Sequence, residues 1–92
     1  MRRKLMERTI KCLLLKTDKV LITEIIEVGS ELGEPDCKII NPFKLNEVDG
    51  EFYLEPWLTF TTQNEFMIHS DSILTIVDPT PTLLEKYQDL IK

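Results

Sequence analysis

Short apolar runs separated by turn residues occupy most of the chain and predict strands rather than long helices. The predicted strands are residues 10–16, 20–28, 37–48, 52–60, 66–69 and 73–77. In the second of these runs, Ile22 and Ile26 lie on one face while Leu21 and Ile25 lie on the other. A strand with two apolar faces belongs in a curled sheet or barrel, or beneath a packed helix.

Turn residues mark the boundaries between these runs. Thr17-Asp18-Lys19 predicts a tight turn, and residues 29–36 predict a loop with two glycines and a proline. Asn41-Pro42 interrupts the third run, and because proline cannot donate a ladder hydrogen bond we expect an edge or a bulge there. Asp49-Gly50 is typical of a type I′ hairpin turn, in which both residues have positive φ.

The last residues change to a helical pattern. Thr80 before Pro81 is typical of an N-cap followed by the first helical residue, and Thr82 with Glu85 offers a capping box as the alternative. Leucine, isoleucine and tyrosine side chains then share one helical face, at positions Leu83, Leu84, Tyr87, Leu90 and Ile91. We expect a helix over residues 81–91 that covers one open end of a barrel.

These elements predict a mostly β fold, a small and strongly bent five-stranded antiparallel sheet or barrel with a C-terminal helix. SH3-like, OB and Sm-like barrels all have this outline. A length of 92 residues allows one domain, which we expect to span residues 1–92. A chain of this size buries a small core, which makes self-association attractive.

Charge is unevenly distributed along the chain. The net charge is −5, yet residues 1–8 carry a local balance of +3 through Arg2, Arg3, Lys4 and Arg8 against Glu7. Residues 22–37 hold five carboxylates and no basic residue. An acidic chain repels phosphate backbones, so broad electrostatic capture of nucleic acid is disfavoured while a local site is not. The basic start predicts either a solvated terminus or an arm that reaches nucleic acid.

Several classes of protein do not fit the sequence. The apolar runs are too short to cross a membrane, and no secretory signal precedes the first strand. Cys12 and Cys37 lack a CxxC partner and share the chain with one histidine, so we expect reduced thiols, a cytoplasmic protein and no metal site. Glycine-rich phosphate loops, GxSxG and HExxH are absent, so we expect neither an enzyme nor a cofactor.

Residues 66–79 (FMIHSDSILTIVDP) resemble the second signature of Sm and LSm proteins, which is an apolar strand, a polar step and a β-branched strand ending near proline. Residues 10–28 are similar to the first two strands of that family. His69 stands where the family has arginine and Ser70 where it has glycine, while residues 46–65 look like an insertion or a lengthened hairpin. Short acidic chains with a C-terminal helix also resemble small Sm-like proteins encoded by marine tailed phages, which would place this one in the host cytoplasm.

The resemblance implies a cyclic homo-oligomer of roughly five to seven subunits, in which free edge strands pair between neighbours. It also implies binding of single-stranded RNA or DNA by two loops on the pore side. One of these loops is residues 29–36, and the other comprises His69, Ser70, Asp71 and Ser72. A ring that has lost RNA binding and serves as a protein-interaction or structural module is the alternative.

Three features have both a functional and a structural interpretation. His69 could stack on a base, or it could be a solvent-facing side chain at a strand end. Asp71 could place negative charge in the pore, or it could hold the turn by bonding its own backbone. Tyr53 and Trp57, expected on one strand face, form either a stacking or partner-binding surface or part of a core or subunit interface.

Overall fold

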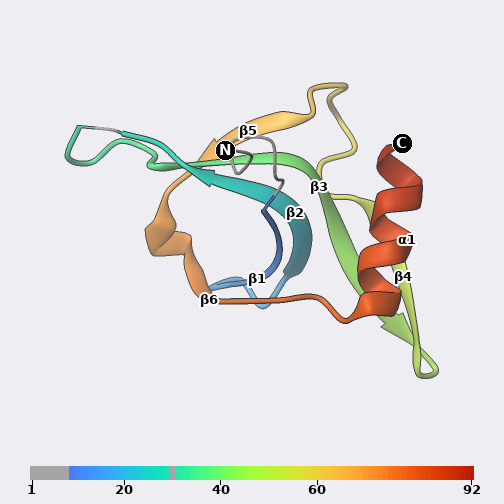
Figure 1. The fold of residues 1–92 in the computed structure, drawn as a ribbon. Helices are drawn as coiled ribbons and strands as arrows, with labels where there is room; N and C mark the ends of the chain where they lie inside the picture. Colours follow the sequence, from blue (N-terminus) through green and yellow to red (C-terminus); the bar gives the residue numbers. More distant parts are fainter. Residues whose placement is uncertain (1–8, 30) are drawn as a thin grey trace, which may run out of the picture.

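Six strands, one 3₁₀ turn and one α-helix make up the computed structural model, which describes residues 9–29 and 31–92 (Figure 1). The elements follow in the order β1 (Ile10–Leu15), β2 (Val20–Glu27), β3 (Cys37–Val48), β4 (Glu51–Pro56), β5 (Glu65–Ile68), η2 (Ser70–Ser72), β6 (Ile73–Val77) and α1 (Pro81–Ile91). All strand pairings are antiparallel, so the predicted mostly β fold with a C-terminal helix is confirmed. The basic residues Arg2, Arg3 and Lys4 lie outside the described residues.

The strands form one sheet in the order β4-β3-β2-β1-β6, and β5 also pairs with β3. The expected count of five strands is therefore wrong. β3 is 12 residues long, which is enough to carry two neighbours in succession: residues 37–40 pair with β5 and residues 43–48 pair with β4. The sheet is not closed, because β6 pairs with β1 alone and β5 with β3 alone among the described residues.

A bulge in β3 separates its two halves, as the Asn41-Pro42 pair predicts. The register with β2 jumps from Ile22↔Phe43 to Glu24↔Ile40, and Asn41 has a φ of 53°. The Thr23 hydroxyl donates to the Ile40 carbonyl at 2.9 Å, so this completely buried polar side chain is satisfied. The bulge changes the direction of β3, so that the strand pairs with β5 before the bulge and with β4 after it.

The β3–β4 hairpin closes on the predicted type I′ turn. Asp49 and Gly50 have φ values of 53° and 83°, and Val48 pairs with Glu51 directly across the turn. The strand expected to run to Phe60 ends instead at Pro56. Trp57 is the first residue past β4: its backbone N–H still donates to the carbonyl of Pro42, its partner in the β3–β4 register, at 3.2 Å, but Pro42 has no N–H to return the bond, so the ladder ends here.

Both faces of the central strands are buried, each in its own cluster. One cluster contains buried Leu13, Leu15, Leu21 and Ile39, with Ile25, Trp57, Phe66, Ile68 and Ile73 packed around them. The other contains Cys12 and Ile22 from the opposite strand faces, with Leu83 and Tyr87 of α1. The expectation that the helix covers an open end is wrong: α1 packs on a face of the sheet (Figure 1).

The start of α1 follows the predicted N-cap arrangement. Thr80 is the N-cap, its hydroxyl accepts the Leu83 backbone N–H at 3.3 Å, and Pro81 opens the helix. The 11 residues of α1 form the only α-helix among the described residues, and no helix there is long and apolar enough to span a membrane.

Candidate functional site

The polar step between β5 and β6 forms the 3₁₀ turn η2, which contains three of the four predicted loop residues. Its backbone is held from inside, because the Ser72 N–H and hydroxyl both donate to the His69 carbonyl, at 3.0 and 2.8 Å. The Asp71 carboxylate is exposed, and no hydrogen bond to it is found among the described residues. Ser72, rather than Asp71 as the turn interpretation expected, therefore closes the turn.

The turn is also held from outside by Asp36, at the end of the 29–36 loop. The Ser70 backbone N–H donates to one carboxylate oxygen of Asp36 at 2.7 Å, and the Ser70 hydroxyl donates to the other at 2.8 Å. The backbone bond, followed by the hydroxyl bond, holds the pKa of Asp36 below its ordinary value. The sequence contained no signal for this contact, which joins residues 34 positions apart.

The two loops implied by the family resemblance therefore lie together and enclose a pocket of about 390 Å³. Four carboxylates line this loop pocket, together with exposed Leu32 and His69; they belong to Glu31, Glu34, Asp36 and Asp71. No group of three or more His, Cys, Asp or Glu side chains arranged to hold a metal ion is found in the described residues. The pocket is negatively charged and suits hydrogen-bond donors rather than phosphate.

His69 also lines a second pocket, of about 370 Å³, on the side of the β1–β2 turn. Its wall is largely apolar and consists of Leu15, Lys16, Thr17, Trp57, Ile68, His69 and Ser72. The structure thus brings Trp57 together with His69, from two segments whose contact has no local sequence signal. We call this cavity the Trp57–His69 pocket.

Tyr53 does not belong to either pocket. It lies on β4, is 51% exposed, and its hydroxyl donates to the Glu51 carboxylate at 3.0 Å. Trp57 lies beyond the end of β4, half-buried, with its ring edge-to-face with Phe66 at a centroid distance of 5.8 Å. Tyr53 therefore lies on β4 and Trp57 one residue past its end, and a stacking or partner-binding surface shared by the two stays a prediction.

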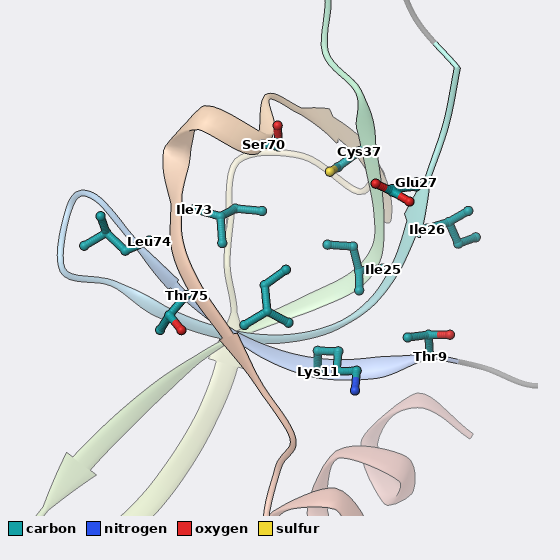
Figure 2. Close-up of a pocket in the computed structure, with 11 residues that line it drawn as sticks. Thr9, Lys11, Ile25, Ile26, Glu27, Cys37, Ser70, Ile73, Leu74 and Thr75 are labelled. Carbon is teal, nitrogen blue, oxygen red and sulfur yellow. The ribbon is translucent and has the colours of Figure 1, made fainter.

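A further cavity, of about 860 Å³, opens between β2 and β6 (Figure 2). Ile25 and Ile73 face one another across it, Thr9 and Lys11 lie at one end, and Ser70 and Cys37 lie at the other. Lys11 forms an ion pair with Asp78, just past the end of β6. Burial, followed by the charges of Asp36 and Glu27, raises the pKa of the Cys37 thiol, which is not the setting of a reactive thiolate.

The strands at the sheet margins expose apolar side chains. On β6, Leu74, Ile76 and Val77 are each at least half exposed, and Met67 is the exposed apolar residue of β5. Edge strands with unpaired backbone groups and apolar side chains are templates for pairing with another chain. These margins are therefore candidate contact surfaces.

A family model described as "Family of unknown function (DUF6561)" matches residues 8–92, which is almost the whole chain. No curated protein was found to match it.

Proposed function

The chain belongs to the Family of unknown function (DUF6561), and we propose that it is a Sm-like ring subunit that binds single-stranded nucleic acid. RNA is the first ligand to test, and single-stranded DNA is the second. The role is binding rather than catalysis, in RNA processing or regulation in the cytoplasm.

The strand order supports the Sm-like part of the proposal. β5, β3, β2, β1 and β6 follow one another as the strands of a strongly bent five-stranded barrel would, and β4 is then an added hairpin arm on β3. β5 and β6 are the free edges of that barrel, and η2 joins them. Pairing β5 of one protomer with β6 of the next satisfies both edges and, repeated, closes a ring of roughly five to seven subunits.

The contact between Asp36 and Ser70 is the observation that carries the ligand-binding part. It fixes the two loops that the resemblance implies around one pocket, with exposed His69 and Leu32 available to contact a base. Asp71 and the two glutamates can accept hydrogen bonds from base amino groups. The same carboxylates repel phosphate, so bases rather than the backbone would enter the loop pocket.

The oligomeric state is the first test. Light scattering on a sizing column should give the mass of a closed ring, unchanged on dilution over the micromolar range. A mass equal to that of one chain would show that the protein forms neither a ring nor a pore.

Binding is tested by fluorescence anisotropy with short labelled RNA and DNA oligomers, beginning at low salt, where phosphate contacts are strongest. We expect binding of single strands that is weakened in His69→Ala and unchanged in the control variant Gln88→Ala, on the exposed side of α1. Absence of binding at low salt would overturn the proposal.

The four carboxylates of the loop pocket favour a second candidate, a ring that binds a basic protein partner. Lysine- and arginine-rich peptides should then bind at low salt, and the double variant Glu31→Gln, Glu34→Gln should weaken that binding several-fold while leaving the ring intact. If nucleic acid binds and these peptides do not, the second candidate is excluded.

A further inference from the structure

We infer that the Trp57–His69 pocket is a base-stacking site, which takes a nucleobase of a single strand while Lys16 contacts the adjoining phosphate. This inference rests on the proposed function and extends it, because it adds a second contact point outside the loop pocket. His69 lines both pockets, so one strand could pass from one to the other over its imidazole.

The chemistry of the pocket wall fits a flat aromatic ring. Trp57 and His69 are the two aromatic residues of the lining, and Leu15 and Ile68 supply apolar surface beside them. Leu15 and Ile68 belong to the cluster inside the sheet, which gives the pocket a packed base. Stacking on indole and imidazole accepts any base, since every base has a π-face.

The charge beside the pocket fits a phosphate. Lys16 is exposed, lines the pocket, and forms no ion pair within the described residues. The three lysines on the described strands are each paired with a nearby carboxylate, in the pairs Lys11–Asp78, Lys38–Glu65 and Lys44–Glu55. Lys16 is therefore an available cation in an acidic protein, and it lies next to the aromatic rings.

Hydrogen bonds within the protein fix the shape of the pocket before any ligand binds. The Lys16 backbone N–H donates to the Ser72 carbonyl at 2.9 Å, and Ser72 in turn bonds the His69 carbonyl. On the other side, Trp57 is fixed by its backbone bond to Pro42 and by the Phe66 ring. A volume of about 370 Å³ lies within the roughly 300–1,000 Å³ of small-ligand pockets.

Trp57 is the only tryptophan, so its fluorescence reports this pocket directly. Titration of the protein with short RNA oligomers should quench Trp57 emission, and the quenching should saturate with the same midpoint as the anisotropy. Lys16→Gln should weaken binding and lower the slope of log affinity against log salt by about one unit relative to wild type. Lys92→Gln, at the end of α1, removes the same charge away from the pocket and should leave the slope unchanged.

Trp57→Leu should weaken binding by about ten-fold, with circular dichroism confirming that the variant folds. The Lys16 variant keeps the inference testable even if Trp57→Leu does not fold. If RNA binds by anisotropy while Trp57 emission stays constant and Lys16→Gln behaves like Lys92→Gln, this inference is wrong and the proposed function stands. If no oligomer binds at all, the proposed function fails and this inference fails with it.

Discussion

The hydroxyl of Tyr87 donates a hydrogen bond to the backbone carbonyl of Asn41, with 2.9 Å between the two oxygens. Tyr87 is completely buried on α1, and the Ile40 carbonyl lies 3.2 Å from the same hydroxyl. The bulge at Asn41-Pro42 turns these carbonyls out of the regular ladder. The helix therefore supplies a hydrogen-bond donor to the carbonyls at the bulge as well as covering the sheet.

Tyr87→Phe removes this hydroxyl and keeps the ring, which packs edge-to-face with Phe43. Because the carbonyls at the bulge then lose a buried donor, we expect the free energy of unfolding to fall by about 1–2 kcal/mol. Urea denaturation measures the change. Tyr53→Phe is the matched control, since its exposed hydroxyl should contribute less than about 0.5 kcal/mol; equal losses in the two variants would contradict the capping role.

Gly50→Ala should destabilise the β3–β4 hairpin. Gly50 has a φ of 83°, and a Cβ at that angle costs roughly 1–2 kcal/mol, although nothing lies within 4 Å of the added atom. Thermal unfolding should show a lower midpoint. Gly29→Ala has the same open surroundings without a positive φ, so its midpoint should be unchanged or slightly higher.

The tie between Asp36 and Ser70 should depend on pH. The pKa of Asp36 is lowered in the folded protein by the bonds from Ser70, so the carboxylate stabilises the fold at pH values above the ordinary aspartate value of about 3.9. This contribution is lost as the pH falls through the folded-state pKa. Wild type should therefore exceed Asp36→Asn in melting temperature at neutral pH, and the difference should shrink below about pH 4. A difference that grows on acidification would show that the sign is wrong.

Ile76→Lys tests the β6 edge as the assembly surface. Ile76 is half exposed on the free edge strand, and a lysine there should block strand pairing between copies, as charged residues do on natural edges. We expect sizing with light scattering to give monomers, with circular dichroism unchanged. Leu90→Lys places the same charge on α1, where the exposure is similar, and should keep the wild-type mass.

Local chemistry made much of the fold predictable. The Asp49-Gly50 turn, the bulge at Asn41-Pro42 and the Thr80 N-cap each depend on residues a few positions apart, and all three are present. The end of β4 was missed because the apolar alternation continues past Pro56, and alternation does not reveal that Trp57 lies opposite Pro42, which has no N–H to continue the ladder.

The candidate site was only partly predictable, because its contacts join distant segments. The sequence placed His69 and the 29–36 loop at strand ends, but the bonds from Ser70 to Asp36 depend on how far β3 carries the chain. The meeting of Trp57 with His69 likewise depends on the bulge at Pro42, which anchors the Trp57 backbone. Neither contact has a local sequence signal.

The burial of both faces of β1 and β2 affects how the register between the strands is determined. In a sheet with one solvent-exposed face, a shift of the strand register by one residue exposes the apolar side chains to water and is therefore unfavourable. Here such a shift would put Cys12 at the buried position of Leu13 and Ile22 at that of Leu21. Each exchange replaces one apolar side chain by another, so burial alone does not reject the shifted register. The correct register is instead distinguished by the buried Thr23 hydroxyl, which in a shifted sheet would lose its acceptor on Ile40, at 2.9 Å, and keep only the longer local contact to the Glu24 carbonyl, at 3.1 Å.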